Sequence, residues 1–253
     1  MYVAMISLFP ELIQAASEHG VLGRALQRKI VDLTLINPRV FASDRHNTVD
    51  DRPYGGGPGM VMMCEPLQAS VSEAQRQFAA QRPDAAQLPV IYLTPSGEPL
   101  TQRVAGELAQ LSGMVLVAGR YEGVDERFVD STVDREISIG DYVLSGGEMP
   151  ALVLLDAVAR LLPGVLGNSA SAVSESHLDG LLDYPHYTRP ENRPEGRVPE
   201  VLLSGDHQAI DRWRRQQALL RTWRRRPDLL SQRPLSAEER KLLAEVLSDL
   251  PNG

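Results

Sequence analysis

The sequence has little cysteine and no long apolar segment, and each absence excludes a class of protein. Cys64 is its one cysteine, so an intrachain disulfide and a cysteine-rich zinc site are excluded. No stretch approaches the roughly 18 apolar residues that a membrane span needs, and we expect no membrane partner. The first residues, MYVAMISLFP, include no basic segment and no small-residue cleavage site, so we expect no signal peptide. A reducing compartment, the cytoplasm, is therefore the expected location.

Lysine is also scarce. Arginine supplies 24 of the 26 basic residues; its guanidinium suits bidentate contacts to phosphate and guanine, although a GC-rich genome explains the same bias. The net charge of −7 argues against a nonspecific polyanion binder. The charge is uneven, because residues 206–226 hold seven arginines and two aspartates, a local balance of +5.

Apolar runs alternate with helical patterns over the first part of the 253-residue chain. Hydrophobic residues make up 43 % and charged residues 23 %, as in ordinary globular proteins. The patterns predict helices after Pro10 and at Glu65–Gln81, Thr101–Leu111 and Glu148–Leu162, and strands at Tyr2–Phe9, Val31–Asn37, Leu88–Thr94, Met114–Ala118 and Glu136–Ile139. Because the strands are continuously apolar, we predict an α/β fold whose parallel sheet carries helices on both faces.

The pattern changes after the long apolar helix. Gly167–Ser176 is small and polar, Tyr184–Pro199 is rich in proline and charge, and the rest is helical. Ile210, Trp213, Leu220 and Trp223 fall near one helical face. We therefore predict a sheet domain at 1–162, a mobile linker at 163–180 and a small all-helical domain at 181–253.

Residues Asn37–Met60 have no usable periodicity and contain the glycine-rich PYGGGPGM, residues 53–60. Loops of this length are typically lids, binding loops or disordered segments. The glycines lack the Lys-Ser/Thr pair of a P-loop and the spacing and preceding strand of a dinucleotide site, which excludes an ATPase or classical Rossmann interpretation. Two interpretations stay open: a backbone that approaches a flat ligand closely, or a flexible hairpin tip.

Three other loops follow predicted strands: Thr94–Gly97, GRYEG at 119–123 and SIGDYVLSGGE at 138–148. Ligands of open parallel sheets bind beyond the carboxyl ends of the strands. Each loop alone is an ordinary turn, but together they predict one pocket.

The last third of the chain offers two more candidate sites. The basic helix with Trp213 and Trp223 either holds nucleic acid through phosphate contacts or is a solvated face over a tryptophan core. Glu175, Asp179 and Asp183 lie in or just after the linker, where a carboxylate can close over a substrate as a general base. Four of the five histidines, His46, His177, His186 and His207, are scattered without metal-ligand spacing, and we predict no metal ligand among them.

Several long motifs, in order and spread over residues 2–230, resemble one known family. They are GGGPGM, GRYEGVDER, SIGDYVLSGGE, LLPGVLGN, GLLDYPHYTRP, VPEVLLSGDH and RTWRRRPDLL. In these the chain resembles the bacterial tRNA (guanine-N1)-methyltransferases of the trefoil-knotted SPOUT class. The resemblance implies a deep knot in the sheet domain, which spacing alone does not indicate because chains almost never thread loops.

The resemblance also implies an activity and its partners. Such enzymes methylate N1 of the guanosine immediately 3′ of the tRNA anticodon, with S-adenosylmethionine as donor. They are homodimers whose active site uses both subunits and whose helical domain grips tRNA, and Mg²⁺ is implied in methyl transfer. The implied donor contacts are Leu93, Thr94, Pro95, Gly119, Tyr121, Glu122, Ser138, Ile139, Gly140, Asp141, Tyr142, Val143, Leu144, Gly146 and Gly147.

Substrate and catalytic roles are assigned in the same way. Guanine N1 carries a proton, so the reaction needs a base at N1 and a cation or donor at O6. By resemblance these are Glu175, where the family usually has aspartate, and Arg160, with Asp179 as the second choice for the base. The predicted substrate contacts, of which Ser171 comes from the resemblance, are Asp50, Tyr54, Gly55, Gly57, Gly59, Ser171, Asp183, Arg214, Arg221 and Arg225.

Two other functions remain alternatives at this stage. One is a related knotted enzyme that acts on another RNA position, such as a ribose 2′-hydroxyl; the carboxylate at Glu175 argues against it, since a ring nitrogen is what needs a base. The other is a non-catalytic RNA-binding protein, against which the three intact glycine loops argue.

Overall fold

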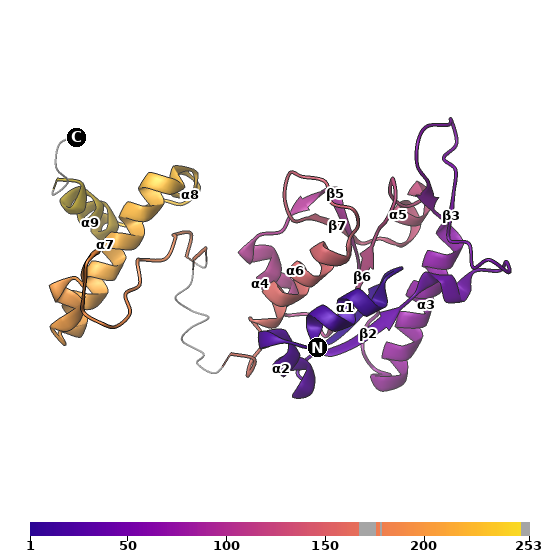
Figure 1. Cartoon of the computed structure of the whole chain (residues 1–253), viewed down its shortest axis with the longest axis horizontal. Coiled ribbons are helices and arrows are strands. Elements are labelled where there is room, and N and C mark those ends of the chain that lie inside the picture. Colours follow the sequence, from indigo (N-terminus) through magenta and orange to yellow (C-terminus); the bar gives the residue numbers. More distant parts are fainter. Residues whose placement is uncertain (167–175, 178, 249–253) are drawn as a thin grey trace. The chain divides into compact units, whose positions relative to one another are not determined.

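The computed structural model of the chain describes residues 1–166, 176–177 and 179–248. The chain divides into two compact units, Met1–Ser169 and Ala170–Gly253 (Figure 1). Each is described here by itself. Within the described ranges, no helix is long and apolar enough to cross a membrane.

A parallel sheet forms the centre of the first unit. Its strand order is β2-β1-β6-β5-β7, and every neighbouring pair is parallel. This confirms the predicted α/β fold with a parallel sheet. The strands are β1 (Tyr2–Ile6), β2 (Asp32–Ile36), β5 (Val90–Pro99), β6 (Gly113–Ala118) and β7 (Arg135–Ser138).

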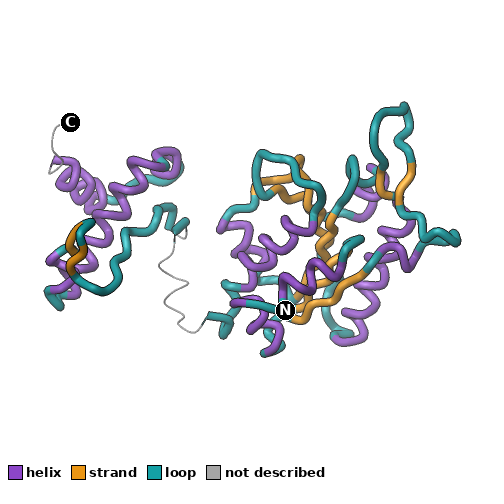
Figure 2. The backbone as a smooth tube through the Cα atoms, viewed as in Figure 1, coloured by secondary structure: helices purple, strands orange, loops and turns teal. Residues whose placement is uncertain are grey.

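Helices cover both faces of this sheet (Figure 2). Successive residues of a strand point to opposite faces, so Val3 and Met5 enter one hydrophobic core while Tyr2 and Ala4 enter the other. Both faces are buried, which explains why the strands are continuously apolar. The first core is closed by α1 (Pro10–Ser17), α2 (Gly20–Gln27), α4 (Gln102–Leu108) and α6 (Glu148–Ala159), and the second by α3 (Cys64–Gln81) and α5 (Glu126–Thr132).

The short helices α2 and α5 were not expected from the sequence. Each has fewer than nine residues, which leaves little periodicity to detect. The start of α5 is set locally, because the Asp125 carboxylate accepts a hydrogen bond of 3.0 Å from the Arg127 amide. Asp125 follows the GRYEGV motif, so this cap fixes where the loop ends.

The expectation that Asn37–Met60 is wholly irregular is wrong. A 3-10 helix, η1 (Pro38–Phe41), is capped by the Asn37 side chain, which accepts from the Arg39 amide at 3.0 Å. Strands β3 (Asp50–Asp51) and β4 (Val61–Met62) then pair antiparallel. Two-residue strands are too short to produce a pattern in the sequence. The PYGGGPGM segment is therefore the tip of a hairpin, and both interpretations of its glycines stay open.

The predicted strand Leu88–Thr94 also ends later than expected, at Pro99. Its pairing with β7 shifts register after Leu93 and resumes at Glu98, which faces Ile137. Residues 94–97 form the resulting bulge. They leave the ladder at the sheet edge, where the sequence predicted a loop.

The second unit contains α7 (His207–Arg225), α8 (Pro227–Ser231) and α9 (Ala237–Ser248). The expectation of an all-helical region after residue 181 is wrong, because the proline-rich segment forms an antiparallel pair, β8 (Asn192–Arg193) with β9 (Gly196–Arg197), and a 3-10 helix, η2 (Glu200–Leu203). The predicted face of α7 is also partly wrong. Leu219 is buried in its core, but Trp223 is 45 % exposed.

Candidate active site

A cavity opens beside the bulge of β5 and at the ends of β6 and β7, and the loops that follow β6 and β7 form its other walls. Of the predicted donor contacts, only Asp141, an exposed residue, is not in the lining. The structure thus brings the three loops together, while the ligand they hold stays a prediction. The predicted residues that line it are Leu93, Thr94, Pro95, Gly119, Tyr121, Glu122, Ser138, Ile139, Gly140, Tyr142, Val143, Leu144, Gly146 and Gly147.

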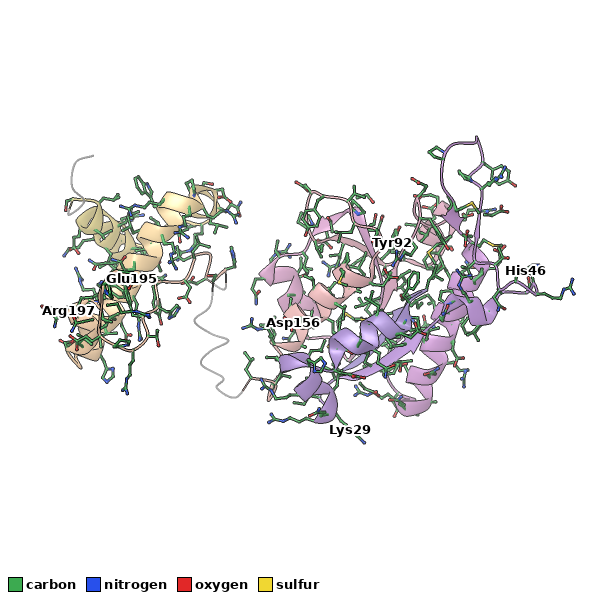
Figure 3. The ribbon with its side chains drawn as sticks, viewed as in Figure 1. Lys29, His46, Tyr92, Asp156, Glu195 and Arg197 are labelled. Carbon is green, nitrogen blue, oxygen red and sulfur yellow. The ribbon has the colours of Figure 1, made fainter. Side chains whose placement is uncertain are left out.

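Five lining residues are absent from the predicted donor contacts. Arg120 and Gly123 belong to the predicted GRYEG loop, whereas Tyr92, Ile137 and Pro150 lie outside all three predicted loops. Tyr92, which is labelled in Figure 3, lies within β5. In the sequence it is part of an apolar run and could not be told from an ordinary core residue. Burial raises the pKa of its hydroxyl, so the phenol stays neutral near pH 7. Arg120 lies inside GRYEG, and its position within a glycine motif was the available signal.

Two of the loops touch backbone to backbone. The Gly147 amide donates a hydrogen bond of 2.8 Å to the Gly119 carbonyl oxygen. A Cβ atom at residue 147 would lie 2.7 Å from the Ala118 Cα atom, closer than real Cβ contacts allow. Only glycine permits this approach, which explains the second glycine of SGGE.

A buried ion pair joins the same two loops through side chains. Arg120 Nε lies 3.0 Å from Glu148 Oε2, and Arg120 Nη1 donates to the Ser145 carbonyl oxygen at 2.9 Å. The Ser7 hydroxyl donates to Glu148 Oε1 at 2.9 Å. The Arg120 guanidinium also lies 4.4 Å from the centroid of the Phe9 ring. The pair therefore ties the cavity wall to the end of β1 and the start of α6.

The base of the β3–β4 hairpin is fastened to the GRYEG loop. The Glu122 amide donates to the Met60 carbonyl oxygen at 3.0 Å. The Met62 amide donates to the Gly123 carbonyl oxygen, and the Asp125 amide to the Met62 carbonyl oxygen, each at 2.9 Å. A hairpin that was predicted to contact substrate thus shares a hydrogen-bond ladder with a wall of the predicted donor cavity.

The hairpin tip is open, unlike its base. Tyr54 is fully exposed. A Cβ atom placed at Gly55 or Gly57 would meet no other atom within 4 Å, whereas one at Gly59 would meet the Glu122 side chain. At the base, burial and the nearby Asp50 carboxylate raise the pKa of the Tyr121 hydroxyl. Predicted substrate residues therefore divide into a free tip and a fixed base.

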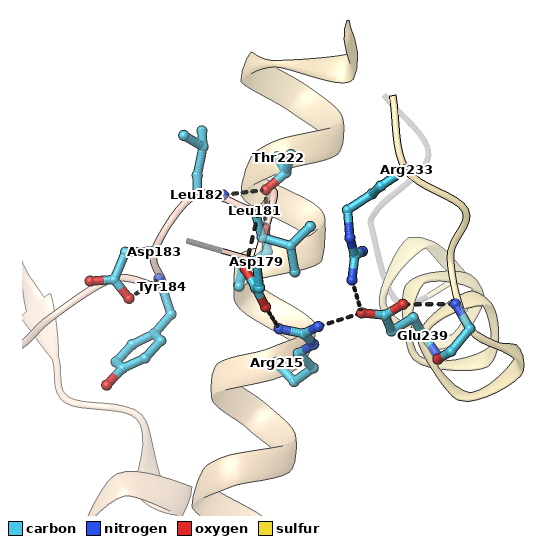
Figure 4. A network of polar contacts seen from close by, with 11 residues as sticks. Asp179, Leu181, Leu182, Asp183, Tyr184, Arg215, Thr222, Arg233 and Glu239 are labelled. Carbon is cyan, nitrogen blue, oxygen red and sulfur yellow. Dashed lines mark hydrogen bonds and ion pairs between the residues drawn. The ribbon is translucent and has the colours of Figure 1, made fainter. Parts of the chain in front are cut away.

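Of the predicted catalytic residues, the structure describes Arg160 and Asp179 but not Glu175. Glu175 and the predicted substrate contact Ser171 lie outside the described residues. Arg160 directly follows α6 and is partly buried. The Asp179 carboxylate is paired with Arg215 on α7 and also accepts a hydrogen bond from the Leu181 amide at 3.2 Å (Figure 4). This carboxylate therefore already has a cationic partner, which it would have to leave before it could act as a base.

The segment that carries Asp183 is attached to α7. The Leu182 amide donates to Thr222 Oγ1 at 2.9 Å, and Arg221 Nη1 donates to the Asp183 carbonyl oxygen at 3.1 Å (Figure 4 shows the first contact). The Asp183 carboxylate accepts from the Tyr184 amide and contacts His186 Nε2, both at 2.8 Å.

The arginines predicted to contact substrate, and their neighbours, differ in whether their guanidinium groups already have protein partners. Arg221 has the structural hydrogen bond just given, and Arg214 Nη1 reaches Asp211 Oδ1 at 3.4 Å. Arg226 pairs with Asp228 at 2.7 Å. Arg224 and Arg225 form no ion pair within the described part of the chain, so they are the arginines of this helix end that can meet a phosphate.

A metal site has no support from the side chains that can be examined. Across residues 1–166, 176–177 and 179–248, no three or more His, Cys, Asp or Glu side chains group together in a way that could hold a metal ion.

Comparison with known proteins identifies the family. A family model described as tRNA (Guanine-1)-methyltransferase TrmD matches residues 1–232. Proteins named tRNA (guanine-N(1)-)-methyltransferase are similar throughout. The protein of Pseudomonas aeruginosa (strain UCBPP-PA14) is 58 % identical over 247 residues, 98 % of this chain and 96 % of the relative.

Two relatives from other genera match equally fully. The protein of Tolumonas auensis is 54 % identical over 250 residues, 99 % of this chain and 98 % of the relative. That of Stutzerimonas stutzeri is 56 % identical over 245 residues, 97 % and 96 % of the two chains. The cavity at the strand ends, the glycine contacts between its loops and these full-length matches lead to one conclusion: the chain belongs to the tRNA (guanine-1)-methyltransferase family.

Proposed function

We infer that the chain transfers a methyl group from S-adenosylmethionine to N1 of the guanosine immediately 3′ of the anticodon in tRNA, and that it works in the cytoplasm, where tRNA is found. The observation that carries this is the cavity formed by the β5 bulge and the loops after β6 and β7, in a chain of this family. Neither alternative function has a comparable observation in its favour.

The cavity residues fit the donor. Gly119 and Gly147 bring two backbones together where a Cβ atom would intrude, and the lining combines backbone polar groups with the Tyr92 ring and Ile137. Such a lining suits a flat base and a polar chain. When bound, S-adenosylmethionine supplies an electrophilic methyl group. We assign the contacts of S-adenosylmethionine to the lining residues and to Asp141, which precedes the lining residue Tyr142 in the chain.

The chain's own groups then have two tasks. Glu175 accepts the N1 proton of guanine, which makes N1 a nucleophile; proton transfer to a positioned base contributes about 10²–10⁴-fold to a rate. Arg160 donates hydrogen bonds to O6, where negative charge grows, and stabilises it electrostatically. Ser171 and Asp183 hold the guanine, and the hairpin residues Asp50, Tyr54, Gly55, Gly57 and Gly59 pack against it. No step is assigned to Mg²⁺, for which the described side chains offer no ligand group.

We also propose that the first unit is a trefoil knot of the SPOUT class. Strand β7 lies at the sheet edge beside β5. The chain after it nonetheless returns to the end of β6, where Gly146 forms a bridge with Arg120 and Gly147 bonds to Gly119. Helix α6 then packs on the core beneath β6. A chain that returns to lie beside the GRYEG loop in this way is what the proposed knot requires.

A homodimer with a shared active site is the proposed assembly. Large apolar side chains are exposed on neighbouring elements of the first unit, since α1 packs on α6 and the loop 139–147 leads into α6. A second copy that covered them would remove this apolar surface from water. The exposed residues are Phe9, Leu12, Tyr142, Val143, Leu144, Met149 and Val153.

We propose that the second unit grips tRNA, with a catalytic domain at 1–162, a mobile interdomain linker at 163–180 and a tRNA-binding domain at 181–253. The support is the arginine content of α7, on which Arg225 is uncommitted and Arg214 and Arg221 are only lightly held. Guanidinium groups on one helix bind phosphates without regard to sequence.

The experiment uses the full chain, S-adenosylmethionine and two tRNA transcripts that differ only in the nucleotide 3′ of the anticodon, guanosine or adenosine. Digestion and mass spectrometry then identify the methylated nucleoside. We expect 1-methylguanosine from the first transcript and no product from the second. A 2′-O-methyl nucleoside, or equal methylation of both transcripts, contradicts the proposal.

A further inference from the structure

The second unit contains a groove that the proposed mechanism does not use. It lies between residues 184–191, η2 and the first half of α7. We call it the aromatic groove. It is defined by Tyr184, His186, Tyr187, Leu203, Ile210 and Arg214. All of these residues belong to one unit, so the groove is independent of how the two units are placed.

Aromatic rings build a platform in this groove. The Tyr184 ring lies 4.7 Å from the His186 ring and 5.1 Å from the Arg214 guanidinium, which holds it between two partners. Beside it, the Tyr187 ring lies 6.4 Å from the Trp213 ring and is tilted to it by 50°. Tyr187 is nevertheless 49 % exposed, and Leu203 is 47 % exposed. The groove thus presents a supported aromatic ring and an aliphatic rim to solvent.

The charges around the platform favour an anionic ligand. The one carboxylate in the groove, Glu191, is neutralised by Arg197 at 2.9 Å. Arg189 forms no ion pair with any described residue. Besides the Tyr184 ring, Arg214 has one carboxylate partner among the described residues, Asp211 at 3.4 Å, and its Nε has no acceptor among them. Two guanidinium groups therefore lack a strong protein partner.

We propose that the aromatic groove binds one unstacked nucleobase of an RNA strand, with the base on Tyr187 and the adjoining phosphate at Arg189 or Arg214. Single-stranded bases stack on exposed aromatic rings whatever their sequence, and arginines hold the backbone beside them. The RNA is the tRNA of the proposed function, so the inference rests on that proposal, but the groove is a second RNA contact separate from the methyl-transfer cavity.

The test uses the only two tryptophans of the chain, Trp213 and Trp223. Trp223→Phe leaves Trp213, the neighbour of Tyr187, as the sole tryptophan. This full-length protein is titrated with an anticodon stem-loop RNA and with copies in which one loop nucleotide at a time is abasic. We expect the intact RNA to quench Trp213, and one particular abasic copy to bind at least about 5-fold more weakly and to lose the quenching.

Variants of Tyr187 complete a double-mutant cycle. Tyr187→Ala should weaken binding of the intact RNA by a similar factor. It should bind the intact RNA and that abasic copy with equal affinity. Tyr187→Phe, which keeps the ring, should bind the intact RNA normally. Thermal unfolding confirms that each variant is folded.

Two results overturn the inference. One is normal affinity of Tyr187→Ala for the intact RNA. The other is that every abasic copy affects Tyr187→Ala and the parent protein equally, as expected if a peptide or a second chain fills the groove instead. Methyl transfer by the unmodified chain is measured in parallel. If the unmodified chain methylates tRNA but Tyr187→Ala binds RNA normally, only the groove is rejected. If the unmodified chain does not methylate tRNA, the proposed function is rejected, and the quenching of Trp213 still tests the groove.

Discussion

Arg120 and Glu148 form an ion pair of 3.0 Å between the loop after β6 and the first turn of α6. The Glu148 side chain is almost completely buried and also accepts the Ser7 hydroxyl. Because one partner lines the cavity and the other begins the helix beneath it, this pair holds the cavity wall on the body of the unit.

Replacing Arg120 should therefore affect both stability and donor binding. Arg120→Ala leaves the Glu148 carboxylate buried without its cation, and breaking a buried pair from one side costs about 3–5 kcal/mol. We expect a large decrease in the thermal unfolding temperature and weaker binding of S-adenosylmethionine by calorimetry. Arg120→Ala with Glu148→Gln removes the stranded charge and should recover part of the stability. Equal unfolding temperatures for Arg120→Ala and the parent would contradict the role of this pair.

Gly147 supplies a second test of the cavity. In Gly147→Ala, the Cβ atom would lie 2.7 Å from Ala118 Cα, so the two loops must separate. We expect donor affinity to fall at least about 10-fold, since the shift moves the backbone groups that we assign to the donor. Calorimetric titration with S-adenosylmethionine measures it.

Gly106→Ala is the matched control for this change. Gly106 lies in α4, and no atom approaches within 4 Å of a Cβ placed there. Alanine favours the helix by about 1 kcal/mol relative to glycine. Donor binding should be unchanged and stability equal or higher. If both glycine variants bind the donor equally, the loops do not form its site.

The central sheet and the convergence of its loops were predictable because both follow from local chemistry. Strands buried on two faces are continuously apolar, as Met114–Ala118 is, and parallel strands place their following loops at one edge. A hairpin tip was one interpretation of PYGGGPGM, but the strands of the hairpin at Asp50–Met62 and the contacts that hold it were not predictable. Its strands have two residues each, and the ladder that holds it runs to Gly123 and Asp125, far along the chain.

Side-chain partnerships were beyond the sequence for a related reason. Asp179 is a carboxylate at a position suited to a general base, but its pairing with Arg215 depends on how the segment packs on α7. Trp223 fits the apolar periodicity of that helix, yet the helix buries Leu219 and Thr222 instead and leaves Trp223 exposed. Periodicity gives an approximate face, and small rotations of the helix decide which residues are covered.

The assignment of the base is tested by paired amide substitutions. Glu175→Gln removes the proton acceptor while nearly preserving size, and should lower kcat by about 10²–10⁴-fold with little change in donor affinity. Asp179→Asn keeps a hydrogen-bonding side chain beside Arg215 and should lower kcat much less. Single-turnover kinetics measures both. If Asp179→Asn shows the larger loss, Asp179 is the base.

Acid should destabilise the second unit through Glu239. Burial alone raises the pKa of this carboxyl, but hydrogen bonds from Arg233, the Ser236 amide and Arg215 outweigh it and lower the pKa from 4.5 to about 2. A depressed pKa means stability that is present above about pH 4.5 and is lost as the pH falls towards 2.

Tryptophan fluorescence measures this loss in the right place, because both tryptophans lie in the second unit. The unfolding temperature that it reports should decrease between about pH 4.5 and 2. Glu239→Gln should be less stable at neutral pH and should flatten that decrease. An unchanged pH profile in Glu239→Gln would mean that other carboxylates govern acid unfolding.

Arg224 and Arg225 should contribute to tRNA affinity through phosphate charge. Neither has an ion-pair partner in the described part of the chain, whereas the neighbouring Arg226 is paired with Asp228 at 2.7 Å. Each guanidinium that meets a phosphate adds about 1 to the slope of log affinity against log salt concentration. Arg224→Gln with Arg225→Gln should weaken tRNA binding and reduce that slope by about 2.

Arg226→Gln is the internal control, since it removes the same charge from the same helix end. Because Arg226 is held by Asp228, its replacement should change the slope by less than either of its neighbours does. Fluorescence anisotropy with labelled tRNA at several salt concentrations gives all the slopes. If Arg226→Gln alters the slope as much as Arg225→Gln, the contribution comes from the net charge of the unit rather than from free guanidinium groups, and the direct phosphate contact is rejected.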